Sequence, residues 1–207
     1  MFITFEGPDG SGKTTQIRIL ASTLIEAGFS VVVTREPGGT AIGDQIRNVL
    51  HDTANTAMSS VAEVLLYSAS RAQLVEEIIR PALADGRIVL CDRYADSTMA
   101  YQGFGRGLDR GMLADLTAYA TGGLKPDLTI YLDLDVSDGL ARRRNEGEEM
   151  NRLDLEAVHF HERVRGGYRL LAAADPGRWI TVDADRPAGE VATEIRDIVL
   201  HRLSVSR

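Results

Sequence analysis

A glycine-rich segment near the start of the chain combines the residue types that bind a phosphate group. Residues 7–14, GPDGSGKT, match the pattern G-x-x-x-x-G-K-[ST], whose glycines let backbone N–H groups surround an anion without Cβ clashes. In this pattern Lys13 reaches the terminal phosphates and Thr14 holds Mg²⁺. The motif predicts a nucleoside triphosphate site. Its expected members are Gly7, Pro8, Asp9, Gly10, Ser11, Gly12, Lys13, Thr14 and Thr15.

The segments that flank this loop have the composition that a phosphate site needs. The apolar run 2–6 predicts a strand that leads into the loop, and residues 15–27 have a helical pattern. A helix that begins near Lys13 directs the positive end of its dipole at the bound anion. A chance glycine loop would have no such context, so the strand, loop and helix together favour the phosphate site.

The rest of the chain alternates between apolar runs and helical segments. Further strands are predicted at 29–34, 87–91, 128–132 and 179–183. Between them we expect helices up to about residue 50, over 60–79, over 110–120, from 137 onward, over 154–174 and from 187 to about 203. Ser60 and Glu63 form a capping-box pattern, and the helix that they open should end near Pro81. This alternation predicts an α/β fold in three layers, a five-stranded parallel sheet with helices on both faces, as a single domain over residues 1–207.

Composition limits the classes of protein to which the chain can belong. It has 207 residues, 44% of them hydrophobic, and a net charge of −7, which argues against a general nucleic-acid or membrane surface. The single cysteine, Cys91, excludes a disulfide within one chain. A functional loop at residue 7 leaves no room for a signal peptide, and no apolar run is long enough to span a membrane. A cytoplasmic location is therefore expected.

Several arginines are predicted at the edge of the sheet where ligands bind. In parallel sheets this edge lies beyond the carboxyl ends of the strands. Arg35 and Arg93 follow predicted strands, and Arg47 and Arg71 lie on the helices that come next. Tyr67 precedes Arg71 by four residues, so one helical face combines an aromatic ring with a planar donor, which suits a nucleobase. Each arginine alone is better explained as a solvated surface residue, but together they favour a second anion site.

A kinase that acts on a small molecule is the class that these features favour. The chain has no N-K-x-D segment that would bind guanine, and outside the phosphate loop it has no D-x-x-G switch after a strand, so a GTPase is disfavoured. A nucleotide-gated regulatory module stays open as an alternative, because a phosphate loop does not by itself prove catalysis. A deoxynucleoside kinase that uses Glu36 as a base is a second alternative.

Five blocks of sequence resemble bacterial thymidylate kinases. They are residues 7–15 (GPDGSGKTT), 34–40 (TREPGGT), 92–94 with Ser97 (DRY), 100–103 (AYQG) and 151–154 (NRLD), and they occur in the same order over nearly the whole chain. The resemblance implies ATP-dependent conversion of dTMP to dTDP with Mg²⁺. It also implies a homodimer.

The resemblance further implies roles around the acceptor nucleotide. Tyr67 corresponds to an aromatic residue that stacks on thymine, and Arg71 to a residue that hydrogen-bonds the edge of the base. Asp9 corresponds to a carboxylate that engages the sugar 3′-hydroxyl. The acceptor-binding residues implied are Asp9, Glu36, Arg47, Tyr67, Arg71, Arg93, Ser97, Thr98, Tyr101 and Gln102. Among these, Arg47 and Arg93 are expected to bind the phosphate. Thr98 and Gln102 are expected to contact the base, and Tyr101 to pack near the ribose.

A lid is predicted over residues 142–153. Gly10 stands where some relatives have arginine, so the cation that stabilises the transferring phosphoryl group must come from elsewhere, and relatives of this kind use lid arginines. The alternative is that Arg142–Arg144 form only the polar end of a helix, where positive charge is favoured. The catalytic residues expected are Lys13, Arg93, Arg143 and Arg152, with Thr14 and Asp92 at the metal.

Overall fold

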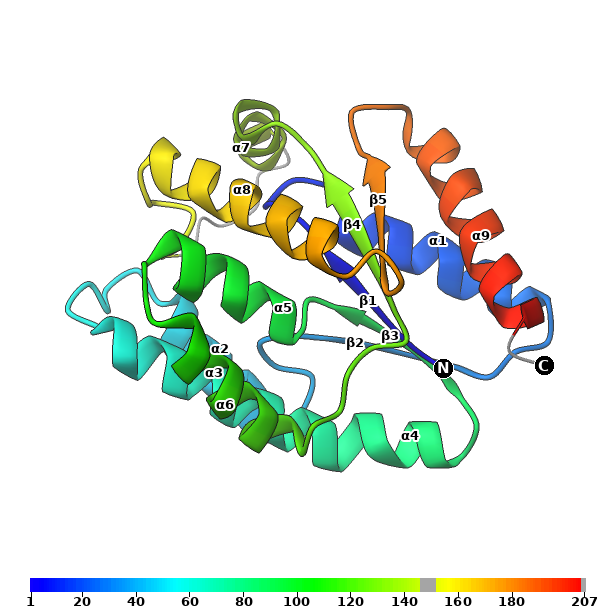
Figure 1. Cartoon of the computed structure of the whole chain (residues 1–207), viewed down its shortest axis with the longest axis horizontal. Helices are drawn as coiled ribbons and strands as arrows, with labels where there is room; N and C mark the ends of the chain where they lie inside the picture. Colours follow the sequence, from blue (N-terminus) through cyan, green and yellow to red (C-terminus); the bar gives the residue numbers. More distant parts are fainter. Residues whose placement is uncertain (146–151, 206–207) are drawn as a thin grey trace.

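A computed structural model describes residues 1–145 and 152–205 of the chain. Five parallel strands form one sheet in the order β2-β3-β1-β4-β5 (Figure 1). The predicted parallel sheet is therefore confirmed. The strands are β1 (Phe2–Glu6), β2 (Val31–Arg35), β3 (Ile88–Asp92), β4 (Leu128–Asp133) and β5 (Trp179–Asp183).

Helices cover both faces of this sheet (Figure 1). On one face α1 packs with α9, and on the other α4 and α8 contact the strands. The segments are α1 (Lys13–Glu26), α2 (Ala41–His51), α3 (Ser60–Leu74), η1 (Val75–Ile79), α4 (Arg80–Ala84), α5 (Ala95–Thr98), η2 (Met99–Gly105), α6 (Arg110–Thr121), α7 (Val136–Asn145), α8 (Val158–Ala174) and α9 (Ala188–Val205), where η1 and η2 are π-helical.

The central strand β1 shows how the core is divided between the two faces. Alternate side chains of a strand point to opposite sides of the sheet. Ile3 and Phe5 pack into the core under α1 and α9, whereas Phe2 packs into the core on the other side, edge to face with Tyr94. All five residues of β1 are buried, so both faces are covered, as expected for a parallel sheet.

The long helix begins at residue 60 as predicted, but the predicted capping residue is wrong. Ser59, and not Ser60, is the N-cap of α3, and its side chain accepts a hydrogen bond from the backbone N–H of Ala62. Glu63 takes no part in a capping box. It is buried and bound to side chains from other segments, because tertiary partners outweigh the local pattern at this position.

The predicted end of the same helix near Pro81 is also wrong. The backbone widens into the π-helical turn η1 and continues through Pro81 to Ala84. Pro81 lies in the first turn of α4, where the missing N–H of proline costs least. The helix expected to begin at residue 154 instead begins at Val158, and the small, polar residues 97–107 are largely helical, as α5 and η2.

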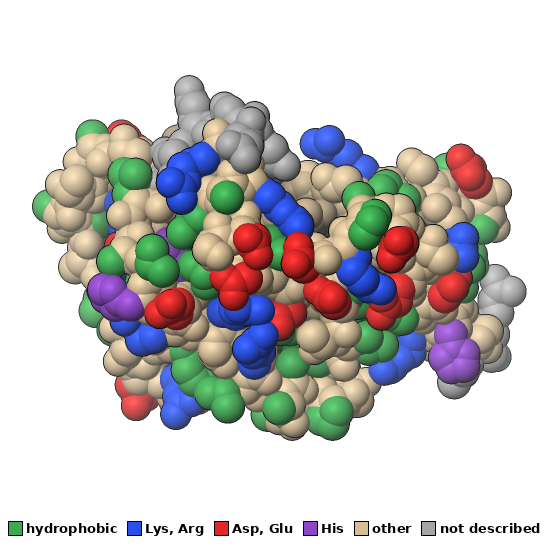
Figure 2. Space-filling view, turned by 90° about the horizontal axis from the view of Figure 1, so that it is seen from above, with side chains coloured by type: hydrophobic (Ala, Val, Ile, Leu, Met, Phe, Trp, Pro, Cys, Tyr) green, Lys and Arg blue, Asp and Glu red, His purple; other side chains and the backbone are tan. Residues whose placement is uncertain are grey.

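The surface carries charges of both signs. On the face seen in Figure 2, acidic and basic side chains are interspersed, in keeping with a chain of 30 acidic and 23 basic residues. None of the helices in the described part of the chain has the length and the apolar character needed to cross a bilayer.

Candidate active site

A cavity of about 600 Å³ opens at the carboxyl ends of the strands. The glycine loop after β1, the loops after β2 and β3, and helices α2 and α3 all contribute to its wall. The cavity is of the size that encloses small-molecule ligands. Predicted site residues that line it are Asp9, Gly10, Gly12, Lys13, Thr14, Thr15, Glu36, Arg47, Tyr67, Arg71, Asp92, Arg93, Ser97, Thr98, Tyr101, Gln102 and Arg143.

The glycine loop is closed around the side chain of Lys13. Its Nζ donates to the carbonyl oxygens of Gly7 and Pro8, at 3.2 and 2.8 Å, and lies 3.3 Å from Ser11 Oγ. Burial, together with the nearby Arg93, lowers the pKa of Lys13 to about 8, while neighbouring carboxylates oppose this shift. The ammonium group is thus placed at the loop, where an anionic phosphate would stabilise its charge.

Thr14, in the first turn of α1, lies against Asp92, the last residue of β3. Thr14 Oγ1 donates a hydrogen bond to Asp92 Oδ2 at 2.6 Å. A hydroxyl and a carboxylate are hard oxygen ligands of the kind that Mg²⁺ prefers, and this ion commonly uses only one or two protein ligands beside phosphates and water. The pair therefore fits the predicted metal position. Within the described residues, no cluster of three or more His, Cys, Asp or Glu residues offers another metal site.

Arg93 is the centre of a network at the mouth of the glycine loop. Its Nη2 donates to Asp9 Oδ1 at 2.8 Å and to the Tyr101 hydroxyl at 3.0 Å. The Tyr101 hydroxyl in turn donates to Asp9 Oδ2 at 2.7 Å. Burial would raise the pKa of Asp9, but Arg93 and Lys13 outweigh burial and hold that pKa well below its usual value. Asp9 is therefore an ionised acceptor at neutral pH.

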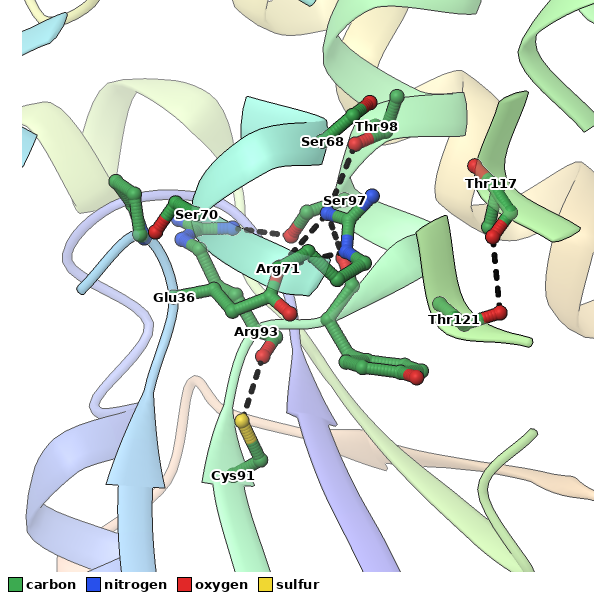
Figure 3. A network of polar contacts seen from close by, with 12 residues as sticks. Glu36, Ser68, Ser70, Arg71, Cys91, Arg93, Ser97, Thr98, Thr117 and Thr121 are labelled. Carbon is green, nitrogen blue, oxygen red and sulfur yellow. Dashed lines mark hydrogen bonds and ion pairs between the residues drawn. The ribbon is translucent and has the colours of Figure 1, made fainter. Parts of the chain in front are cut away.

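Arg71 is held by a deeply buried ion pair with Glu36. Its Nε and Nη2 lie 2.8 and 2.7 Å from Glu36 Oε2, and Nη2 also donates to Thr98 Oγ1 at 2.9 Å (Figure 3). Burial would lower the pKa of Arg71, but the Glu36 carboxylate raises it, so the guanidinium stays charged. Among the described residues, Arg71 Nη1 and Glu36 Oε1 have no hydrogen-bond partner. Both residues belong to the wall of the cavity, and these two atoms are buried within it.

The residues predicted at the base lie on the same side of the cavity. Tyr67 is one turn before Arg71 on α3, and burial raises the pKa of its hydroxyl, which therefore stays protonated. Gln102 belongs to η2 and donates from Nε2 to Glu63 Oε1 at 2.8 Å. An aromatic ring, a guanidinium and an amide thus converge on one part of the cavity.

The two lid arginines expected to act in catalysis occupy different places. Arg143, near the end of α7, lines the cavity, and its Nη2 lies 2.7 Å from Asp154 Oδ2. Arg152 is not brought to the cavity. Its guanidinium pairs with Glu63, and its Nε donates to the carbonyl of Leu50 at 3.3 Å. The part of the predicted lid at 146–151 lies outside the described residues.

Close packing explains why position 10 is glycine. Gly10 has φ 77°, and a Cβ at this position would collide with the backbone carbonyl of Gly139 in α7. An arginine side chain is therefore excluded from this loop conformation. The same packing brings the start of α7 against the glycine loop, so that Arg143, one turn further along, reaches the cavity.

His51 and Glu6 were not among the residues assigned to the site from the sequence. His51, the last residue of α2, lines the cavity, and burial together with Arg47 lowers its pKa to about 4, so the imidazole is neutral at pH 7. Glu6, at the end of β1, is completely buried, and burial together with Asp96 raises its pKa to about 7. In the sequence, Glu6 could have been noticed as the one charged residue at the end of an otherwise uncharged strand, residues 2–6.

The fold and the site define the class of protein. A five-stranded parallel sheet whose first strand ends in a phosphate loop, with arginines gathered at the same edge, is the architecture of a P-loop kinase.

Comparison with known proteins identifies the family. Residues 5–195 match the family model described as thymidylate kinase. The chain is 53% identical over 210 residues to a thymidylate kinase of Trichlorobacter lovleyi, covering 99% of both chains. It is 56% identical over 194 residues to that of Thermomicrobium roseum, covering 94% of this chain and 91% of the relative. The crystal structure of thymidylate kinase from Ehrlichia chaffeensis superposes with a TM-score of 0.78 at 35% identity, covering 96% of this chain and 98% of the other. The chain belongs to the thymidylate kinase family, which confirms the resemblance and the prediction of a kinase.

Proposed function

We propose that this protein transfers the γ-phosphoryl group of ATP to the phosphate of dTMP, producing dTDP and ADP. The observation that carries the proposal is a single cavity that joins the glycine loop to Tyr67, Arg71 and Arg93. The loop provides a triphosphate site, and the aromatic ring with the two guanidinium groups provides a site for a nucleobase and a second phosphate. Both substrates can therefore lie in one cavity with their phosphates adjacent.

The chemistry needs no general base, because the acceptor oxygen of a monophosphate is already anionic. The rate then depends on positioning the two phosphates and on neutralising the negative charge between them. In the proposal Arg93 and Arg47 hold the acceptor phosphate, and Asp9 accepts a hydrogen bond from the sugar 3′-hydroxyl. Ionised Asp9 is an acceptor only, which suits that role.

On the donor side, the loop amides and Lys13 bind the β- and γ-phosphates. Thr14 and Asp92 would hold Mg²⁺, which supplies further neutralisation of phosphate charge when bound. Arg143 reaches the cavity from α7 and is the lid arginine that we assign to the transferring phosphoryl group. Arg152 is assigned a supporting role, because its guanidinium is paired with buried Glu63.

A coupled assay with separate acceptors tests the proposal. Purified protein with ATP and Mg²⁺ should form ADP rapidly with dTMP and not with thymidine. Turnover of thymidine alone would favour the deoxynucleoside kinase, and ATP binding without transfer to any monophosphate would favour the nucleotide-gated module. Glu36 is a poor candidate for the base of a deoxynucleoside kinase, since one of its oxygens is paired with Arg71 at 2.7 Å.

The quaternary structure that we propose is a homodimer formed through α2 and α3. These neighbouring helices carry large apolar side chains that are each roughly half-exposed, namely Ile42, Val49, Val61 and Leu65. Exposed apolar side chains that gather on neighbouring helices are characteristic of a protein interface. Sedimentation analysis should give a dimer for the wild-type protein and a monomer for Leu65→Glu, and a monomeric wild type would refute this assembly.

We place the protein in the cytoplasm, where ATP and free nucleotides are available. Cys91 is a buried free thiol, which suits a reducing compartment. No nucleic acid or membrane partner is proposed. Fractionation of cells that express a tagged chain tests this location, and recovery with the membrane fraction would contradict it.

A further inference from the structure

Arg93 has a backbone conformation that residues other than glycine seldom adopt. Its φ is 69°, and it is the one non-glycine residue with a positive φ in the part of the chain that the structure describes. Its own N–H donates to the Phe5 carbonyl at 2.9 Å, and the Cys91 thiol donates to its carbonyl at 3.0 Å (Figure 3). The N–H of the next residue, Tyr94, donates to Glu6 Oε1 at 2.8 Å. The Glu6 carboxylate therefore helps to fix this backbone.

The same carboxylate reaches the guanidinium of Arg93 through two hydroxyl groups. Glu6 Oε2 accepts from Ser97 Oγ at 2.6 Å and from the Tyr168 hydroxyl at 2.8 Å. Arg93 Nη1 donates to these two hydroxyl oxygens, at 3.3 and 3.0 Å. Because a hydroxyl has one proton, each hydroxyl that donates to Glu6 presents only lone pairs to Arg93. One buried carboxylate is thus linked to both ends of the arginine, to its backbone through the N–H of Tyr94 and to its guanidinium through two hydroxyl groups.

An ionised carboxylate is the group that satisfies all of these contacts, because both of its oxygens act only as acceptors. A glutamine has nearly the same shape but carries one donor. If its NH₂ replaced Oε1, it would face the N–H of Tyr94. If its NH₂ replaced Oε2, the hydroxyl protons of Ser97 and Tyr168 would turn toward the guanidinium. Glu6→Gln therefore disturbs Arg93 in either orientation.

We propose that Glu6 is a positioning residue for the acceptor phosphate, and that it holds both the backbone and the guanidinium of Arg93 in the orientation that grips this phosphate. The inference rests on the proposed function, in which Arg93 contacts the phosphate of dTMP. Glu6 is fully buried at the end of β1 and does not line the cavity, so in this proposal it acts on the ligand through Arg93.

Calorimetric titration of the whole chain at pH 8, where Glu6 is mostly ionised, with dTMP and separately with a non-hydrolysable ATP analogue tests the proposal. Glu6→Gln should raise the Kd for dTMP at least about tenfold, the effect of one well-placed hydrogen bond to a charged group, and leave the Kd for the ATP analogue within about twofold. The matched control is Asp96→Asn, which also removes a buried carboxylate. Asp96 pairs with Arg178 at 2.6 Å, and at pH 8 Glu6 is mostly ionised with or without Asp96, so this control should lower the melting temperature without changing the Kd for dTMP.

A double-mutant cycle shows whether Glu6 acts through Arg93. In an Arg93→Met background, Glu6→Gln should weaken dTMP binding no further. If Glu6→Gln alone leaves the Kd for dTMP within about twofold of wild type, weakens both ligands equally, or has its full effect in the Arg93→Met background, the role of Glu6 is refuted. Wild-type protein that does not bind dTMP refutes the proposed acceptor instead. If Glu6→Gln does not fold, Tyr168→Phe, which removes one hydroxyl of the relay, must weaken dTMP binding while retaining ATP binding.

Discussion

The two sides of the acceptor cavity hold their arginines by different means. On the α3 side, Arg71 projects from a regular helix and is paired directly with Glu36, with side-chain exposures of 1% and 3%. On the side of β1 and β3, Arg93 follows a strand with φ 69°, and its guanidinium is shared among carbonyl, carboxylate and hydroxyl oxygens. Arg71 has one carboxylate, one carbonyl and one hydroxyl as partners, whereas Arg93 depends on a larger network drawn from several segments.

This difference predicts different consequences when a residue is removed. Breaking a two-membered buried ion pair leaves one charge without compensation, so the main cost falls on folding. In a network the remaining members still hydrogen-bond to one another, so stability changes little. The main effect of removing one member is that the arginine is positioned less accurately. The α3 side should therefore respond chiefly in stability, and the β1–β3 side chiefly in catalysis.

The largest effect is expected from Arg93→Met. Loss of the acceptor-phosphate contact should lower kcat/KM for dTMP about 10³-fold, equivalent to about 4 kcal/mol of transition-state stabilisation. Steady-state kinetics at saturating ATP measures this change, with retained binding of the ATP analogue as the control. A loss smaller than about tenfold would mean that Arg93 has a structural role only, and the contrast between the two sides would disappear.

A change at Glu36 tests the other side of the comparison. Glu36→Gln removes the charge that compensates Arg71, and we expect it to lower the free energy of unfolding by about 3 kcal/mol. The matched control is Glu76→Gln, at the exposed pair with Arg80, where the change should be below about 0.5 kcal/mol. Urea unfolding without ligand gives both values. Equal values for the two variants would show that the Arg71–Glu36 pair is not important for folding.

A substitution at Tyr67 separates base recognition from both arginines. Loss of the aromatic face in Tyr67→Ala should weaken dTMP binding by about 1–3 kcal/mol, by analogy with base stacking in other proteins. Tyr119→Ala is the control, because Tyr119 is 89% exposed on α6. Titration with dTMP and the ATP analogue should show a loss confined to dTMP. Equal losses of both ligands would indicate that α3 itself had been disrupted.

The smallest effect is a pH dependence that originates at Glu6. Its pKa is raised to about 7 from an ordinary 4.5, so acidification from pH 8 to 6 protonates the folded protein at this group. A protonated carboxyl must donate in one of its hydrogen bonds, so Arg93 is held less firmly, and the KM for dTMP should rise about threefold or more as the pH falls. The charged and titratable groups that face Glu6 are Lys13, Arg71, Cys91, Arg93, Asp96 and Tyr168.

Measuring the KM for dTMP of wild type and of Glu6→Gln at each pH separates the titration of Glu6 from the titration of the substrate. The phosphate of dTMP titrates in the same range, but it does so equally for wild type and variant. The ratio of their KM values should therefore be greatest at pH 8 and smaller at pH 6. A ratio that does not change with pH would show that Glu6 does not titrate in this window.

The regular part of the fold could be predicted from the sequence because its signals are local. Each buried strand is a short apolar run, and the glycine loop is contiguous in the chain, so the sheet and the phosphate site followed without tertiary information. The errors lay where tertiary contacts override a local preference. The capping pattern at Ser60 and Glu63 failed because Glu63 is used by Gln102, Arg106 and Arg152, and Pro81 failed to end a helix because a π-helical turn precedes it.

By itself, the sequence determined the class of fold, the phosphate loop and the set of arginines that could meet an anion. The pairing of those arginines was decided only by the tertiary structure. Glu6 and Tyr168 are 162 residues apart and share a hydrogen bond of 2.8 Å, and Arg93 joins the network from a third segment. Local periodicity reports which face of an element is buried, but it contains no information about which distant polar group will meet another there. That outcome depends on the stacking of the elements, because only their packing brings these charges out of water and into contact.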